Sequence, residues 1–325
     1  RSYHDAINYA PNQVLLGNRK PDSLAELPRP WFNAKSEGST ETGPHGALVD
    51  EEQFYAILKT ADDFDLIWLE QSFSAKAKDR LQHNPLLSSS DLEQISGMPS
   101  SVLEEKLLED DEALPLTLSN GEVIGIIRRR LHDDSTMAPD ILLENLAAKA
   151  TATMAMRSVI TSTGNQPEAI DYIVGSGEEA IGDRYNRGGG NLAKAVAEDA
   201  GCVNATGADV KAFCSAPVHA MIMAGSLIAS EVYKNVAVVG GCSLAKLGMK
   251  YRGHLAKEIP ILEDTLVGFA ILMGPDDGNS PLLRLDSVGR HTVGSGSSQQ
   301  QIIESLVQNP LENMNLRFTD IDKYA

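Results

Sequence analysis

From about residue 119 onward, apolar segments of two lengths alternate along the chain. Short runs such as "IDYIVGSG" (170–177) and "NVAVVGGCSLAK" (235–246) have the length and β-branched content of buried strands. Longer stretches between them, such as "SAPVHAMIMAGSLIAS" (215–230), have the apolar content and length of helices. This alternation predicts a mostly parallel sheet with helices on its faces. Further strands are expected at 121–131, 205–213, 265–274 and 281–292, and further helices at 140–163, closed by Gly164, and at 186–201.

The N-terminal residues have a different pattern. Residues 1–48 are rich in Pro, Gly and Asn and are expected to form an irregular arm. Residues 49–114 are acidic and have helical spacing, with a break near "ADDFD" (61–65). Two capping boxes are predicted here, Ser90 with Glu93 and Ser101 with Glu104. We therefore expect an irregular arm and helical extension over 1–118 and an α/β domain over 119–325.

Composition narrows the class of protein. The 325 residues include 28 Lys and Arg against 45 Asp and Glu, a net charge of −17. So acidic a chain is not expected to bind nucleic acid, which requires a basic face. No apolar run approaches the roughly 18 to 20 residues that span a bilayer, and no secretory signal opens the chain. We expect a cytoplasmic protein and, without an initiator Met, a fragment of a longer one.

The chain has three cysteines, Cys202, Cys214 and Cys242, without CxxC spacing. This count and spacing favour free thiols over disulfides or a zinc site, and no metal or cofactor is expected. Cys214 lies where a predicted strand meets a predicted helix that is apolar almost all round. Backbone N–H groups at such a helix start stabilise a thiolate and also an oxyanion on a thioester carbonyl. Cys214 is thus a candidate nucleophile whose own N–H is one oxyanion donor.

The alternative is that Cys214 is a buried core cysteine with only a structural role, since cysteine is often buried. Cys202 and Cys242 are both expected to be structural. His219, five residues after Cys214, and His291, near a Gly/Ser-rich loop, are second-rank candidates for proton transfer or phosphate contact. Both His219 and His291 are also consistent with a purely structural role.

Several polar residues near predicted strand ends are weaker candidates for substrate binding. Glu178 follows a strand that ends in glycines. Asn186 and Arg187 open a Gly-rich turn that enters a helix, an arrangement that suits anions but lacks the P-loop and dinucleotide-binding spacings. Glu263 and Asp264 precede another strand. Tight packing explains the glycines equally well.

The block from "EAIDYIVGSG" through "FCSAPVHA" and "VVGGCSLAK" to "LEDTLVGFAILMG" resembles the thiolase superfamily, most closely its ketoacyl synthase III branch. The resemblance covers roughly residues 135–325. It implies a layered α/β/α fold and places Cys214 at the nucleophile position. It also implies that most of the second thiolase half, which supplies further catalytic groups in that family, is missing here. "EDTLVGFA" replaces the family's "GDGAGA"-like loop, which argues against carbon–carbon condensation.

A longer resemblance spans the whole chain. "YAPNQV", "RPWF", "NRGGGN", "AGCVNATGAD", "LEDTLVGFA" and "VGRHTVGSGSS" look like the beta subunits of component C of glycine/sarcosine/betaine reductase complexes. This implies a subunit that receives a two-carbon unit from a carboxymethylated selenoprotein A as an acetyl thioester on Cys214. Phosphate then releases acetyl phosphate. The implied partners are an alpha subunit, selenoprotein A and phosphate, and pairing into a dimer or larger oligomer is expected.

Two alternatives remain open. One is a ketoacyl synthase III-like condensing enzyme that acts on acyl thioesters. The other is a non-catalytic scaffold subunit of the reductase complex, which predicts an unreactive Cys214.

Overall fold

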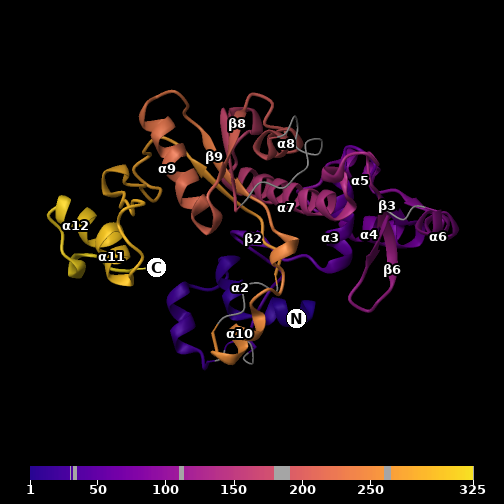
Figure 1. Ribbon diagram of the computed structural model, residues 1–325, viewed down its shortest axis with the longest axis horizontal. Helices are drawn as coiled ribbons and strands as arrows, with labels where there is room; N and C mark the ends of the chain where they lie inside the picture. Colours follow the sequence, from indigo (N-terminus) through magenta and orange to yellow (C-terminus); the bar gives the residue numbers. More distant parts are fainter. Residues whose placement is uncertain (30, 32–34, 110–112, 179–190, 260–264, 325) are drawn as a thin grey trace.

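The computed structural model describes residues 1–325 apart from 30, 32–34, 110–112, 179–190, 260–264 and 325. Its central feature is a four-stranded sheet in the order Phe269–Met273 (β10), Val236–Gly240 (β9), Tyr172–Gly177 (β7) and Thr206–Lys211 (β8) (Figure 1). β7 pairs in parallel with β8 and β9, while β10 runs antiparallel to β9. The predicted, mostly parallel sheet is confirmed.

Helices cover both faces of this sheet. Side chains alternate along β7, so that Ile173 packs with helices Pro139–Thr163 (α7) and Leu192–Asp199 (α8), whereas Val174 packs under Ala216–Ala229 (α9). The result is a three-layer α/β/α arrangement. The predicted C-terminal glycine of α7 is confirmed, because Gly164 has φ 68° and its N–H bonds the carbonyl of Thr161.

A second sheet lies toward the N-terminus. Its order is Gly97–Met98 (β4), Ile67–Glu70 (β3), Val123–Ile127 (β6) and Leu114–Thr117 (β5). β6 pairs antiparallel with both β3 and β5. The strand predicted at 121–131 therefore belongs to this second sheet.

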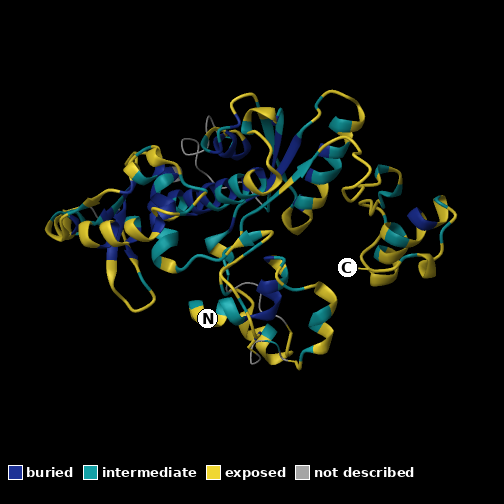
Figure 2. Ribbon diagram, turned by 180° about the vertical axis from the view of Figure 1, so that it is seen from behind, coloured by how far each residue is buried: buried dark blue, intermediate teal, exposed yellow. Residues whose placement is uncertain are grey.

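Helix α7 joins the two sheets, because its 25 residues are long enough to reach both cores. Leu142 and Leu146, in its first half, pack with residues of the N-terminal sheet. Met156 and Ile160, in its second half, pack against the central sheet. Residues 144–150, in the first half of α7, form a continuous buried run (Figure 2).

The remaining described elements are short. In Figures 1 and 2 the N-terminal residues and α10 are drawn in one lower lobe, and the C-terminal helices form another, mostly exposed lobe. The remaining described helices and strands are α1 (Tyr3–Asn8), α2 (Ala10–Leu15), β1 (Thr42–Gly43), β2 (Gly46–Ala47), α3 (Glu51–Thr60), α4 (Gln71–Leu81), α5 (Ser89–Gln94), α6 (Ser100–Glu109), α10 (Tyr251–Ala256), α11 (Gln299–Ile303) and α12 (Asn309–Asn313). The described 3₁₀ turns are Pro21–Glu26, Ser135–Met137, Pro167–Ala169, Phe213–Ser215, Leu244–Lys246, Leu285–Ser287 and Phe318–Asp320, and Glu304–Gln308 forms a π-helical turn.

Two expectations for the N-terminal region were wrong in detail. The break near 61–65 is followed by strand β3 (Ile67–Glu70), which was not predicted, and helices α4, α5 and α6 come after it. The carboxylate of Asp62 accepts the N–H groups of Leu66 and Ile67 and so directs the chain into the strand. The capping box at the start of α5 is Ser88 with Asp91, and α6 begins at Ser100, so neither Ser90 nor Ser101 is an N-cap.

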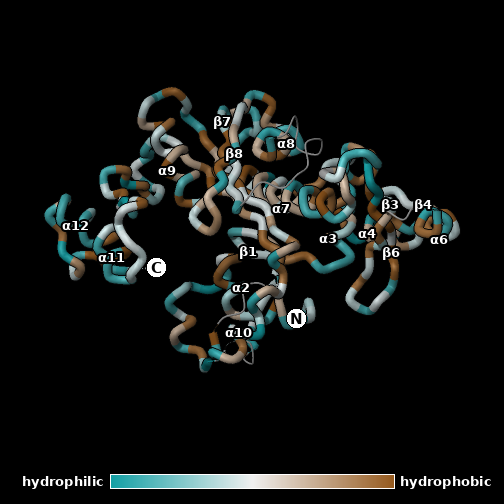
Figure 3. The backbone as a smooth tube through the Cα atoms, viewed as in Figure 1, coloured by the Kyte–Doolittle hydropathy of each residue, from teal (hydrophilic) through white to brown (hydrophobic). Residues whose placement is uncertain are grey.

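The expectations for the C-terminal part were also partly wrong. Residues 281–292, predicted as a strand, contain a 3₁₀ turn at Leu285–Ser287 instead, and none of the described strands pairs with them. Helix α9 is not buried all round, although its residues are hydrophobic (Figure 3). Only Ala216, Ala220 and Ala224 are buried, while Val218 is 53% exposed.

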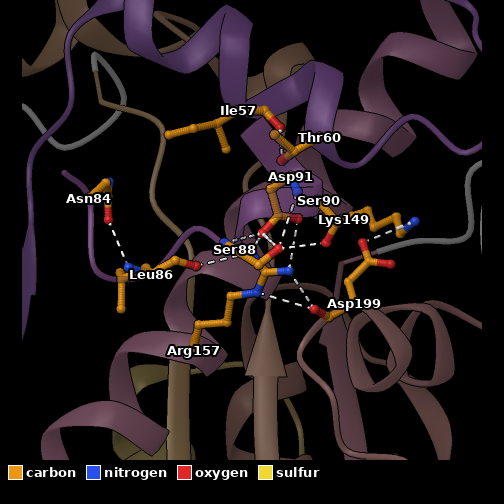
Figure 4. Close-up of polar contacts among 10 residues, drawn as sticks. All are labelled: Ile57, Thr60, Asn84, Leu86, Ser88, Ser90, Asp91, Lys149, Arg157 and Asp199. Carbon is orange, nitrogen blue, oxygen red and sulfur yellow. Dashed lines mark hydrogen bonds and ion pairs between the residues drawn. The ribbon is translucent and has the colours of Figure 1, made fainter. Parts of the chain in front are cut away.

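A cluster of charged side chains ties the two sheets together on one face of α7 (Figure 4). Arg157 donates hydrogen bonds to both carboxylate oxygens of Asp91, at 2.8 and 3.1 Å, and to the carbonyls of Leu86 and Asp199. These contacts connect α5, α7 and the end of α8.

Lys149, two turns before Arg157 on α7, is buried within the same cluster. Its ammonium donates to the carbonyl of Ala61 at 3.1 Å and to Asp63 at 2.6 Å, and it forms an ion pair with Asp199 at 3.1 Å. The buried charge is therefore fully paired, as a buried ammonium requires.

Candidate functional site

The candidate site lies where the three parallel strands of the central sheet end. Glu178 directly follows β7, Cys214 follows β8 within the turn Phe213–Ser215, and Lys246 follows β9 in the turn Leu244–Lys246. The carboxyl ends of parallel strands meet at one edge of a sheet, which is where open α/β sheets bind ligands. The topology thus brings together three polar side chains from distant parts of the sequence.

A strained turn presents Cys214 to solvent. Phe213 has φ 50°, in the left-handed region that bulky residues rarely adopt. Its N–H bonds the carbonyl of Glu178 at 2.9 Å, and the N–H of Ser215 bonds the carbonyl of Ala212 at 3.2 Å. The turn reverses the chain between β8 and α9 and leaves the Cys214 side chain exposed. Strain of this kind is common at functional sites.

The thiol of Cys214 contacts a carboxylate. Sγ donates a hydrogen bond to Oε1 of Glu178 at 3.3 Å, and Nζ of Lys246 lies 3.3 Å from Oε2 of the same carboxylate. The hydrogen bond from Cys214 lowers the pKa of Glu178 most strongly, and the Lys246 ion pair lowers it further against the opposing effect of burial. Glu178 is therefore an ionised proton acceptor beside the thiol.

The backbone at the site also suits acyl chemistry. The N–H of Cys214 donates to no residue that the structure describes, and a backbone N–H beside a nucleophile is the kind of donor that stabilises an oxyanion. An oxyanion on a carbonyl bonded to Sγ would lie near this donor. The hydroxyl of Ser176, on β7 two residues before Glu178, is buried and likewise makes no hydrogen bond within the described residues.

The structure brings together only part of the residue set predicted from the sequence. Cys214 and Glu178 are in contact. His219 is exposed and makes no hydrogen bond to the described part of the chain, and His291 bonds the carbonyl of Gly296 in its own loop at 2.6 Å. The predicted residues Asn186, Arg187, Glu263 and Asp264 lie outside the described residues.

The sequence analysis did not identify Lys246 as a site residue. The available signal was its position in "VVGGCSLAK", shortly after a buried strand parallel to the strand that precedes Cys214. A lysine in a loop is common, however, and only the observed strand order places it beside Glu178.

The other two cysteines are buried, as expected, and burial raises the pKa of both Cys202 and Cys242 to about 11. Since the thiolate is the reactive form, iodoacetamide should modify Cys214 in the folded protein at least roughly tenfold faster than either. Mass spectrometry of proteolytic peptides would measure the three rates. In urea the three thiols should react alike, and equal rates in the folded state would contradict the prediction.

The described residues show neither a metal site nor a membrane-spanning helix. They contain no cluster of three or more His, Cys, Asp or Glu side chains arranged to hold a metal ion. None of the helices in the described part of the chain has both the length and the apolar character needed to cross a membrane.

Comparison with known sequences connects this site to two groups of proteins. Residues 208–278 match the family 3-oxoacyl-[acyl-carrier-protein] synthase III. The chain is 42% identical over 328 residues to the glycine/sarcosine/betaine reductase complex component C subunit beta of Peptoclostridium acidaminophilum, which covers all of this chain and 63% of that relative. A beta-ketoacyl-[acyl-carrier-protein] synthase III of Desulfitobacterium hafniense is 29% identical over 136 residues, 40% of each chain.

Solved structures give a weaker, partial overlap. The priming β-ketosynthase of the R1128 polyketide pathway superposes with a TM-score of 0.32 at 21% identity, over 47% of this chain and 39% of that one. OleA of Xanthomonas campestris, with bound lauric acid and lauroyl-CoA, superposes with a TM-score of 0.37 at 11% identity, over 61% of this chain and 63% of that one. The relationship to known proteins therefore rests on the sequence matches.

These matches confirm both resemblances expected from the sequence, and the layered sheet agrees with the expected thiolase-like α/β fold. The chain spans less than two thirds of the length of the curated relatives that it matches. Along its whole length the chain is similar to the beta subunit of component C of a glycine/sarcosine/betaine reductase complex, and around Cys214 it is ketoacyl synthase III-like.

Proposed function

We propose that this chain is an acyl-transfer subunit that carries an acetyl group as a thioester on Cys214. The observation that carries the proposal is the exposed Cys214 at the carboxyl edge of the sheet, hydrogen-bonded to Glu178 and with its own N–H unpaired among the described residues. Acyl capture requires a nucleophile, an oxyanion donor and a path for one proton, and this edge offers all three.

The 42% identical relative supports a more specific assignment, because its name is that of a reductase-complex subunit. On that basis we assign the chain to a complex with an alpha subunit and a carboxymethyl-carrying selenoprotein A. The acetyl thioester on Cys214 forms as the carbon–selenium bond breaks, and the selenium of selenoprotein A is oxidised by the two electrons that reduce the carboxymethyl carbon to a methyl group. Phosphate then releases the thioester as acetyl phosphate. In that step the phosphate oxygen–carbon bond forms, the carbon–Sγ bond breaks, and the thiol regains a proton.

The experiment runs this step backwards. The chain is incubated with acetyl phosphate, and the peptide that contains Cys214 is analysed by mass spectrometry. We expect one acetyl group on Cys214, its loss with hydroxylamine, and none in Cys214→Ser. Cys202→Ala, which changes a buried thiol, is the matched control and should be acetylated normally.

The alternatives predict other outcomes. A scaffold subunit would leave Cys214 unmodified by acetyl phosphate, which would overturn the proposal. A condensing enzyme would take acetyl groups from acetyl-coenzyme A in preference to acetyl phosphate, and would then form acetoacetyl thioester from malonyl thioester. The match of residues 208–278 to the synthase III family is the reason to test this second donor.

A further inference from the structure

Glu178 holds the turn of Cys214 through its backbone and its side chain. Its carbonyl accepts the N–H of Phe213 at 2.9 Å, and its Oε1 accepts the thiol of Cys214 at 3.3 Å. Nζ of Lys246 lies 3.3 Å from the other carboxylate oxygen. Thiol, carboxylate and ammonium are therefore linked in a chain of contacts, and the carboxylate cannot turn away from Sγ without breaking its ion pair.

Neither histidine predicted from the sequence contacts Cys214 in the part of the chain that the structure describes. His219 makes no hydrogen bond there, and the ring of His291 is engaged by Gly296. Glu178 is the proton acceptor in contact with Sγ among the described residues. A carboxylate so placed satisfies the geometric requirement for a general base, which is hydrogen-bond reach of the proton it removes.

We propose that Glu178 is the catalytic general base and acid for Cys214, and that Lys246 is the positioning residue that holds Glu178 turned toward the thiol. The proposal rests on the acyl-transfer function proposed above. As the Sγ–carbon bond forms, the thiol proton passes to Oε1 and an electron pair of the carbonyl moves to its oxygen. When the intermediate collapses, the bond to the leaving group breaks, and Glu178 returns the proton to that group.

The charges around the pair set the expected pH dependence. Lys246 and Lys250 come from the segment after β9, and both lower the pKa of Glu178. Nζ of Lys211, at the end of β8, lies against Gly177. The carboxylate of Glu178 accepts the proton of the reacting thiol. Reactivity should therefore persist at a pH at which an isolated thiol is almost unreactive.

The test is the rate of Cys214 alkylation by iodoacetamide from acid to alkaline pH, which does not depend on acyl transfer. The wild-type rate should fall to a plateau below neutral pH and drop again only when Glu178 is protonated, below roughly pH 4.3. In Glu178→Gln the plateau should disappear and the rate should fall about tenfold per pH unit, to at least roughly tenfold below wild type at about pH 5. At alkaline pH the variant should react as fast as wild type or faster.

Lys246→Met should keep the plateau but move its acid edge to higher pH, because the cation that lowers the pKa of Glu178 is gone. Lys257→Met, at the exposed end of α10, is the matched control and should leave the profile unchanged. A plateau that survives in Glu178→Gln would overturn the proposal.

Acetylation by acetyl phosphate separates this proposal from the proposed function. Glu178→Gln should slow acetylation of Cys214 by roughly 100-fold, the usual lower range for a general base. If wild type is acetylated and the variant is equally fast, the role of Glu178 is wrong and the function stands. If the plateau depends on Glu178 but wild type is never acetylated, the function is wrong and the thiol–carboxylate pair stands.

Discussion

Replacing Arg157 with Met is expected to lower the free energy of unfolding by about 3–5 kcal/mol, the usual loss when one partner of a buried ion pair is removed. Met preserves most of the apolar stem, so the loss reports the guanidinium. The side chains of Arg157 and Asp91 are only 17% and 10% exposed. Without Arg157, the Asp91 carboxylate would lose its counter-ion in a site with little access to water.

Two features of Arg157 make the effect larger than that of an ordinary ion pair. Burial acts to raise the pKa of Asp91, but the hydrogen bonds from Arg157 and Ser88 outweigh it and hold that pKa below its usual value. Arg157 also donates to the carbonyls of Leu86 and Asp199, which would be left with fewer donors. The substitution should therefore loosen α5 from α7.

Urea unfolding followed by circular dichroism would measure the loss, and hydrogen exchange over residues 84–94 would show where the structure opens. Arg317→Met is the matched control: its ion pair with Asp320 is exposed, with Arg317 82% exposed, so the change should be within about 0.5 kcal/mol. A loss for Arg157→Met as small as that of the control would show that the Asp91 contact adds no stability.

The central sheet was predictable from the sequence because each of its strands carries its own signal. β7 and β9 are short apolar runs that neighbouring helices bury on both sides, and the run itself marks them as strands. β3 was not recognised, because the four residues Ile67–Glu70 follow a helix and fit its spacing as well as that of a strand. Its identity is decided by pairing with β6, a partner more than fifty residues away that spacing cannot indicate.

The same distinction applies to the site. The position of Cys214 between a strand and a helix is local, so it could be inferred from the sequence. The contact of Cys214 with Glu178 requires β7 and β8 to be neighbours, and the contact of Glu178 with Lys246 requires β9 to lie on the other side of β7. His219 was a second-rank candidate, five residues after Cys214, and the structure leaves it exposed and without a hydrogen bond to a described residue.

A pH-dependent loss of stability is expected from Asp199, at the end of α8. Burial raises the pKa of this carboxyl to about 6, against the attraction of Lys149. Two further effects raise the pKa of Asp199 in the same direction as burial. Asp63 shares the same ammonium and repels Asp199, and a carboxylate at a helix C-terminus meets the negative end of the helix dipole.

The sign follows from proton linkage. The folded protein holds the proton of Asp199 more tightly than the unfolded chain, whose ordinary value is 3.8. The stability that the protonated Asp199 contributes is fully present below pH 3.8 and is lost as the pH rises to about 6. A difference of about two between the folded and unfolded pKa values corresponds to roughly 3 kcal/mol.

Asp199→Asn, which resembles the protonated side chain at every pH, provides the reference. The free energy of unfolding of wild type minus that of Asp199→Asn should fall by roughly 3 kcal/mol between about pH 4 and 6 and stay level above pH 7. Asp322→Asn, at an exposed carboxylate near the C-terminus, is the control for the Asp-to-Asn substitution itself. A difference that instead rises with pH would mean that the attraction of Lys149 exceeds the cost of burying Asp199, so that the ion pair stabilises the junction between the two sheets as a charged pair.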